Sequence, residues 1–226
     1  MKAIILAAGI GKRLGNIIPK CLTELADGKS IIEYQIEKLT EFVGLHNIYI
    51  VVGYKKTLIM ERFPNLIYIY AERFAHTNTS KSLLCALEKT DDDVIWLNGD
   101  VFFDASLPWL LTRNSESAAL VDNKKCGEEE IKYNVDSEGY IREISKQVEK
   151  PIGEALGINF IIRDDVPFLV EELRKVGDND YFEKAIENLT LSGKLKIRPV
   201  DKGDYFCEEI DFPEDLELVN NHLSGR

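Results

Sequence analysis

The sequence predicts an α/β protein: a Rossmann-like three-layer sandwich with a mixed, mainly parallel sheet and a small antiparallel lobe. Two observations predict this fold. In the first half of the chain short apolar runs alternate with segments of helical period, and from about Ser117 strand-like runs follow one another without helices. Nearly continuous apolar runs are typical of strands covered on both faces. Their alternation with helices implies right-handed crossovers between parallel strands.

The strands of the sandwich are predicted from short runs rich in β-branched and aromatic residues. These runs are Ala3–Ala7, Ile48–Val52, Leu66–Ala71 and Val94–Asn98. Between them, leucine and isoleucine recur at helical spacing in two segments. We therefore expect helices over Ile31–Phe42 and Ser80–Glu88.

The lobe is predicted from strand-like runs that have no helices between them. These runs are Ala118–Val121, Ile131–Val135, Tyr140–Ile144 and Ala155–Ile162. Residues 136–139, Asp-Ser-Glu-Gly, are typical of a hairpin turn. The rest of the chain predicts helices over Asp164–Val176 and Tyr181–Leu191, strands near Leu195–Val200 and Phe206–Glu208, and a last helix that Pro213 begins.

We expect one domain over residues 1–226, because a chain of this length can bury a substantial core. No internal repeat, low-complexity tract or linker divides the sequence. Its expected parts are a first half (about 1–116), the lobe (about 117–200) and a C-terminal segment (201–226).

Composition argues against several classes of protein. The net charge of −11 and the isoelectric point near 4.9 argue against non-specific nucleic-acid binding. The four cysteines form no C-x-x-C pair, which argues against a zinc site or a disulfide framework. No stretch approaches the length of a membrane span or of a signal-peptide core. We expect a cytoplasmic protein, either monomer or homodimer.

The segment "LAAGIGKRLGNIIPKCLTEL" places a glycine-rich, basic loop directly after the first strand. It is not a dinucleotide fingerprint, because Asn16 takes the place of the third glycine when G-x-G-x-x-G is counted from Gly11. It is not a P-loop, because Arg13 stands where a P-loop has Ser or Thr. Backbone N–H groups of such a loop can approach phosphate oxygens. Together with Lys12, Arg13 and Lys20 they favour a polyphosphate ligand. A solvated turn without a ligand is the alternative.

Two carboxylates follow strand-like runs far apart in the chain. Asp100 in "WLNGDVFFD" comes at the carboxyl end of a strand, where α/β sheets bind ligands. Asp211 lies in "CEEIDFPEDLELV", just before Pro213. Each also fits a purely local role, Asp100 as a turn former and Asp211 as a helix cap.

The opening loop resembles the signature of the nucleotidyltransferases that activate sugar phosphates and small phospho-alcohols, L-A-A-G-x-G-x-R followed by P-K-x-L. Gly9, Gly11, Arg13, Pro19 and Lys20 fall on that pattern. Lys12 departs from it, because Ser or Thr is commoner there in the sugar branch. The segments around Asp100 and Asp211 resemble the family's two metal-binding carboxylates. The resemblance implies that both hold Mg²⁺.

Within this superfamily the middle of the chain resembles the phosphocholine cytidylyltransferase group. The resemblance rests on "VVGY", which contains Gly53, on "HTNTSKSLL", and on "EEIKYNVDSEGYIREISKQVEKPIGEALGINFI". It implies an acceptor-binding lobe in which Lys146 faces the acceptor's phosphate and Glu154 meets a cationic head group or orders the lobe. Further nucleotide-binding positions are then Leu6, Ala7, Ala8, Asn78, Thr79 and Ser80. The alternative there is simple helix capping, which Thr79 or Ser80 could provide alone.

The implied reaction is CTP + phosphorylated acceptor → CDP-linked product + pyrophosphate. In it Arg13 and the backbone of the glycine loop hold the β- and γ-phosphates, and Lys20 neutralises charge near the α-phosphate. Phosphocholine and related phospho-alcohols, phosphonates and phosphoglutamine are the expected acceptors. A quaternary ammonium favours aromatic faces, for which the candidates are Tyr133, Tyr140, Phe160, Tyr181, Phe182, Tyr205 and Phe206.

Two alternatives stay open. One is a sugar-1-phosphate nucleotidyltransferase that uses UTP or dTTP. The other is a non-catalytic module that binds a nucleotide without turning it over. The acetyltransferase fusions of the superfamily carry a hexapeptide-repeat tail, which we do not expect here because these 226 residues contain no such repeat.

Overall fold

The computed structural model of the chain describes residues 1–11 and 18–225. Lys12 and Arg13, two of the predicted site residues, lie outside the described residues. The described residues form a nine-stranded sheet with the order β10-β6-β9-β4-β1-β2-β3, to which β7 and β8 add at β9. The strands of the ordered path are β1 (Lys2–Ala7), β2 (Ile48–Val52), β3 (Ile67–Tyr70), β4 (Val94–Asn98), β6 (Ala118–Asp122), β9 (Gly153–Ile161) and β10 (Arg198–Asp201).

The sheet is mixed and mainly parallel, as predicted. β1 pairs in parallel with β2 and β4, β2 with β3, and β6 with β10, whereas β9 runs antiparallel between β4 and β6. In this register Leu6 lies opposite both Val51 and Asn98. The carboxyl ends of β1, β2 and β4 therefore meet at one edge of the sheet, the edge at which such sheets bind ligands.

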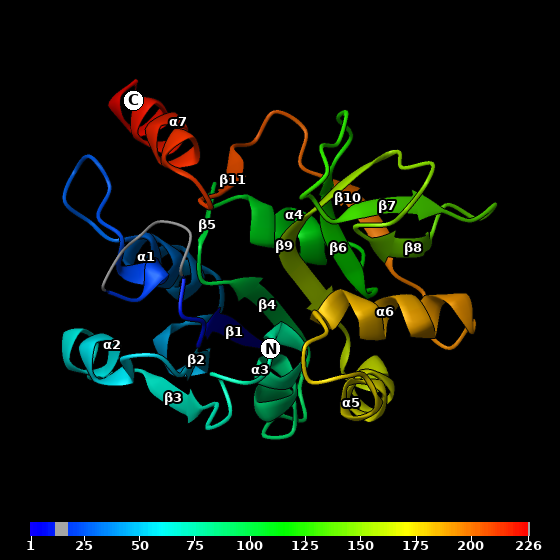
Figure 1. Cartoon of the computed structure of the whole chain (residues 1–226), viewed down its shortest axis with the longest axis horizontal. Helices are drawn as coiled ribbons and strands as arrows, with labels where there is room; N and C mark the ends of the chain where they lie inside the picture. Colours follow the sequence, from blue (N-terminus) through cyan, green and yellow to red (C-terminus); the bar gives the residue numbers. More distant parts are fainter. Residues whose placement is uncertain (12–17, 226) are drawn as a thin grey trace.

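Helices cover both faces of the sheet and complete three layers (Figure 1). One face packs against α1 (Ile31–Val43), α2 (Lys56–Arg62) and α4 (Leu107–Thr112), and the other against α3 (Thr79–Leu87), α5 (Val166–Lys175) and α6 (Phe182–Leu191). The strands alternate between these cores: Ile4 and Leu6 belong to one, Ile5 and Ala7 to the other. This period of two is the normal consequence of strand geometry.

The antiparallel lobe is continuous with the sheet. β7 (Lys132–Val135) and β8 (Ile141–Ser145) form the predicted hairpin across residues 136–139. β9 is long enough to pair with β7 near its start and with β4 near its end. For this reason β6 and β9, which the sequence groups with the lobe, lie in the main sheet.

The C-terminal segment returns to the edge where β1 and β4 end. β11 (Cys207–Glu209) pairs antiparallel with β5 (Val101–Phe103), and α7 (Pro213–Ser224) begins at the predicted proline. A small core that includes Phe102, Ile210 and Val219 fixes this segment against the start of α1. Within the described residues, no helix is both long and apolar enough to cross a membrane.

Candidate active site

A cleft of about 390 Å³ opens at the carboxyl ends of β1 and β4. It is bounded by the glycine loop, the start of α3, the lobe and the segment after β11. Its lining residues are Leu6, Ala7, Gly9, Gly11, Lys20, Cys21, Asn78, Thr79, Asn98, Gly99, Asp100, Glu129, Ile131, Lys146, Ala155, Gly157, Tyr181, Glu183, Glu209 and Asp211. Ten of the predicted site residues thus lie around one cleft, although most of them are far apart in the chain.

Lys20 lines the cleft from a short 3-10 helix, η2 (Lys20–Leu22). Gly11 has a φ of +62°, and a Cβ there would lie 2.8 Å from the Cβ of Lys20. The loop can therefore lie close against Lys20 only because residue 11 has no side chain.

Lys20 bridges the two predicted carboxylates. Its Nζ donates to Asp100 Oδ2 at 2.7 Å and to Asp211 Oδ1 at 2.5 Å. Burial alone lowers the pKa of Lys20, but attraction and hydrogen bonds to Asp100 and Asp211 outweigh it and raise the pKa. A charged ammonium therefore lies between two carboxylates that are 80 and 191 positions away in sequence.

The backbone holds both carboxylates at this point. The buried side chain of Gln35 on α1 donates to the carbonyl oxygens of Asn98 and Val101, at 2.9 and 2.7 Å, and so fixes the turn that carries Asp100. The Ile210 N–H donates to the Asp100 carbonyl at 3.0 Å, which brings the next residue, Asp211, beside it. The position of Asp211 thus follows from the pairing of β11 with β5.

The two carboxylates that Lys20 binds, Asp100 and Asp211, fit a magnesium ion. Asp100 Oδ1 is buried and has no hydrogen-bond partner, so one oxygen of the pair remains available to a cation. The described residues contain no cluster of three or more His, Cys, Asp or Glu side chains of the kind that encloses a metal. Mg²⁺ is commonly held by one or two carboxylates and completes its shell with water and substrate phosphates.

The start of α3 forms the next wall of the cleft. Asn78 caps the helix through Oδ1, which accepts from the Thr79 N–H at 2.8 Å. The Thr79 hydroxyl oxygen accepts from the Phe182 N–H at 3.2 Å and joins the starts of α3 and α6. Ser80 is fully buried and does not line the cleft. Of these three residues, Asn78 and Thr79 are placed to contact a ligand.

Two other predicted nucleotide-binding residues lie beside the cleft and not on its surface. The Ala8 carbonyl accepts from the Tyr54 N–H at 3.1 Å. A Cβ on Gly53 would lie 2.6 Å from the Ala8 oxygen and from Phe74. These contacts give Gly53 a packing role where β1 and β2 end.

The lobe contributes Lys146 but not Glu154. Lys146 Nζ pairs with Glu129 Oε2 at 3.0 Å and lies 5.8 Å from the centre of the Tyr181 ring. Glu154 instead pairs with Lys124 at 2.8 Å in an adjoining pocket of about 160 Å³, which shares Glu129 and Asp211 with the cleft. Successive side chains of a strand point to opposite faces, so Glu154 points away from the cleft that Ala155 and Gly157 line.

Two glutamates of the cleft, the buried Glu183 and the half-buried Glu209, escaped the sequence analysis. Burial raises the pKa of Glu183 to about 7, and burial together with the nearby Asp100 charge raises that of Glu209 to about 8. Glu209 Oε1 accepts from Asn98 Nδ2 at 3.1 Å. Glu183 lies in the first turn of α6, where acidic residues are common. Its sequence position therefore looks like an ordinary helix start.

We expect Glu183→Gln to stabilise the protein at alkaline pH. The pKa of Glu183 is raised from 4.5 to about 7, so the folded state keeps a proton that the unfolded state releases. The free energy of unfolding of the wild type therefore falls as pH rises from 4.5 to about 7. The titratable groups facing Glu183 are Lys146 and Glu209. The variant should be more stable by about 1–3 kcal/mol at pH 8 and equal near pH 4. Urea unfolding at both pH values measures the difference, and a constant difference would contradict the assignment.

We expect Gly157→Ala to destabilise the protein strongly. Gly157 has a φ of +65°, and a Cβ there would lie 2.2 Å from Glu209 Oε1 and 2.9 Å from Asn98 Nδ2. Strain and overpacking together should cost about 2–4 kcal/mol. The matched control is Gly193→Ala, where φ is +69° but nothing lies within 4 Å, so only about 1 kcal/mol of backbone strain is expected. Denaturant unfolding that gave both variants equal losses would show that packing against Glu209 is unimportant.

The fold and the site together define an α/β protein whose nucleotide-type cleft lies at the carboxyl edge of its sheet. More particularly, the chain belongs to the family of the MobA-like NTP transferase domain, which matches residues 3–143. The superfamily expected from the opening loop is thereby confirmed.

Individual relatives extend over nearly the whole chain. The bifunctional protein GlmU of Methanococcus maripaludis (strain C5) is 33% identical over 241 residues, covering 100% of this chain and 55% of that protein. The chain therefore spans about half the length of this curated relative. UTP–glucose-1-phosphate uridylyltransferase AglF of Haloferax volcanii is 28% identical over 240 residues, covering 99% of this chain and 96% of AglF.

Among solved structures, CTP:phosphocholine cytidylyltransferase from Streptococcus pneumoniae matches with a TM-score of 0.77. The match covers 98% of each chain at 22% identity. It confirms the predicted fold class across the sandwich and the lobe.

Proposed function

We propose that the protein transfers a nucleotidyl group from a nucleoside triphosphate to a small phosphorylated acceptor and releases pyrophosphate. The observation that carries this proposal is the Lys20 ammonium between Asp100 and Asp211, in one cleft with the glycine loop. A cation that can meet phosphate, two carboxylates that can hold a divalent metal, and backbone N–H groups are what such a transfer needs. A non-catalytic module has no use for the complete set.

CTP is the nucleotide we propose first. The support is the resemblance around Gly53 and Asn78 to the phosphocholine cytidylyltransferase group, together with the fold shared with the pneumococcal cytidylyltransferase. The relatives GlmU and AglF favour a second candidate, transfer from UTP to a sugar phosphate. The two candidates share the phosphate chemistry and differ in the base and in the acceptor.

The proposed reaction needs alignment and charge neutralisation. An oxygen of the acceptor's phosphate attacks the α-phosphorus, the new P–O bond forms, and the bond between the α-phosphorus and the bridging oxygen breaks as pyrophosphate leaves. A phosphate dianion is already nucleophilic, so no general base is required. Holding the two substrates in line then supplies much of the rate enhancement.

Each residue of the cleft has a proposed task in that alignment. Lys20 exchanges its carboxylate partners for an oxygen of the α-phosphate, and Lys146 meets the acceptor's phosphate. Asp100 and Asp211 would hold Mg²⁺, which would supply positive charge to the phosphate groups. Arg13, outside the described residues, is proposed for the β- and γ-phosphates with the N–H groups of the glycine loop.

Pyrophosphate release tests the proposal. The purified chain with Mg²⁺ is offered CTP, UTP, dTTP, ATP and GTP against phosphocholine, phosphoethanolamine, 2-aminoethylphosphonate, phosphoglutamine and glucose 1-phosphate. We expect release with CTP and one of the first four acceptors. Release only with UTP or dTTP and the sugar phosphate would establish the second candidate, and nucleotide binding without release would establish a binding module.

A further inference from the structure

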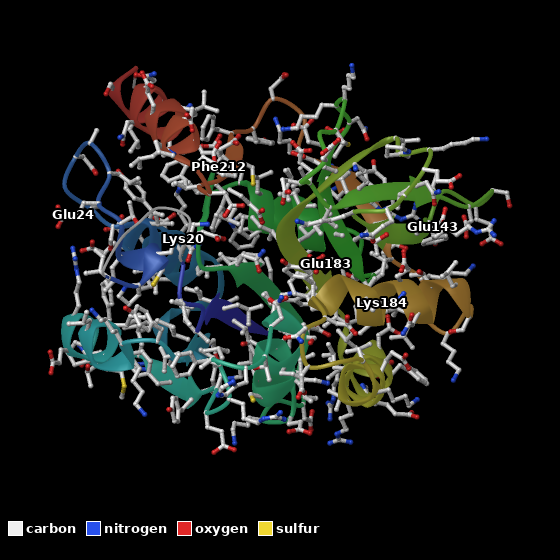
Figure 2. All side chains as sticks on the ribbon, in the orientation of Figure 1. Lys20, Glu24, Glu143, Glu183, Lys184 and Phe212 are labelled. Atoms are coloured by element: carbon white, nitrogen blue, oxygen red, sulfur yellow. The ribbon has the colours of Figure 1, made fainter. Side chains whose placement is uncertain are left out.

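Glu183 is a buried carboxylate whose second oxygen has no partner inside the cleft. The residue is 6% exposed, and its Oε2 is buried without a hydrogen bond. Figure 2 labels Glu183 at the start of α6 and Lys20 near α1, and both residues line the cleft. A buried acceptor without a donor costs folding free energy. Such a group is expected where a ligand supplies the missing donor.

The charges around Glu183 favour a cation as that ligand group. The described lining of the cleft holds five carboxylates against two lysines. Lys20 is engaged by Asp100 and Asp211, and Lys146 by Glu129. Glu209 accepts a hydrogen bond from the Asn98 amide. A positively charged donor at Glu183 would satisfy the orphan oxygen and reduce this excess of negative charge.

The aromatic residues point to a primary rather than a quaternary ammonium. A quaternary ammonium has no N–H to donate and is best bound by several aromatic faces. Of the aromatic residues considered for such a cage, Tyr181 alone is among the described residues that line the cleft, while Tyr133, Phe160 and Phe182 are core residues. One ring does not enclose a trimethylammonium group, whereas a carboxylate suits an N–H donor.

We propose that Glu183 binds a primary ammonium group of the acceptor, so that the acceptor is an aminated phosphate or phosphonate. This inference rests on the proposed function. The acceptor's phosphate then lies toward Lys146 and its amine toward Glu183. An amino alcohol phosphate, an aminoalkylphosphonate and an amino sugar phosphate all carry this chemistry.

Matched acceptor pairs test the assignment in the wild-type protein. The pairs are 2-aminoethylphosphonate with 2-hydroxyethylphosphonate, and glucosamine 1-phosphate with glucose 1-phosphate, each with the nucleotide found active above. We expect kcat/KM to favour the amine by about 10- to 100-fold in one pair, and that pair identifies the source of the amine. Equal values within both pairs would overturn the proposal while leaving nucleotidyl transfer intact.

Variants assign the preference to Glu183. Glu183→Gln should lower kcat/KM for the aminated acceptor by about 10- to 100-fold and change that for its hydroxyl partner by less than about threefold. Glu171→Gln is the control, because Glu171 is exposed on α5 and pairs with Lys175. Equal loss with both acceptors would make Glu183 a structural residue and overturn the proposal.

Calorimetric binding separates this inference from the proposed function. 2-Aminoethylphosphonate and glucosamine 1-phosphate are titrated into wild type and Glu183→Gln in the absence of turnover. At least one amine should bind wild type about tenfold more tightly than it binds the variant. If no nucleotide is turned over but this difference appears, the proposed reaction fails and the ammonium site stands. If neither amine shows it, the site fails.

Discussion

Asp100→Asn is expected to lower kcat by about 10²- to 10³-fold while leaving the fold intact. The reason is the proposed role of Asp100 as one of two carboxylates that would hold Mg²⁺. Asn has the same size but no charge, and its amide is a far weaker ligand for Mg²⁺. The proposed reaction relies on charge neutralisation rather than on a general base, so a weaker hold on the metal should act directly on the rate.

The fold should survive because it uses the backbone of residue 100 and not its carboxylate. The Asp100 carbonyl accepts from the Ile210 N–H, and Gln35 holds the turn through the carbonyl oxygens of Asn98 and Val101. Initial rates measure turnover, the thermal midpoint measures stability, and Mn²⁺ titration measures metal binding. The control Asp164→Asn removes an exposed carboxylate far from the cleft lining and should behave as wild type. Near-normal turnover by Asp100→Asn would exclude Asp100 as an essential metal ligand.

Motifs selected three residues that the structure brings together. Lys20, Asp100 and Asp211 were predicted from segments spread over most of the chain, and the structure brings them within hydrogen-bond distance. This succeeded because each follows a strand end or a glycine turn, where backbone geometry leaves a sequence signature. β5 lacked such a signature, because Val101–Phe103 continues the apolar run of β4 after a two-residue turn.

The acceptor side could not be predicted in the same way. Glu154 was selected by resemblance, but side chains alternate along β9 and that of Glu154 points toward Lys124. Which face of the sheet a strand residue occupies depends on the register of its pairing, and this register is not visible in the sequence. Glu183 was missed because an acidic residue in a first helical turn is normally solvated. Glu183 is buried because its neighbour Phe182 packs against Trp96 on one face of the sheet and donates its N–H to Thr79. Such contacts have no local pattern.

Lys20→Met is expected to change two properties in opposite directions. Turnover should fall by about 10²- to 10³-fold, because the proposed contact with the α-phosphate is lost. Without nucleotide, however, Mn²⁺ should bind about 10- to 100-fold more tightly. The Lys20 ammonium lies 2.7 Å from an Asp100 oxygen and 2.5 Å from an Asp211 oxygen, so a metal ion at this pair must displace it.

The stability of the variant provides a third and independent measurement. Loss of Lys20 removes the ammonium that pairs with both Asp100 and Asp211, so the metal-free variant should melt at a lower temperature than wild type. Mn²⁺ should then raise its melting temperature more than it raises that of wild type, since ligand stabilisation grows with affinity. Lys29→Met, which removes an exposed lysine paired with Glu37, is the matched control. Weaker Mn²⁺ binding by Lys20→Met than by wild type would show that Lys20 helps to assemble the metal site and does not compete with the metal. That result would contradict the proposal that Lys20 moves from the two carboxylates to the α-phosphate.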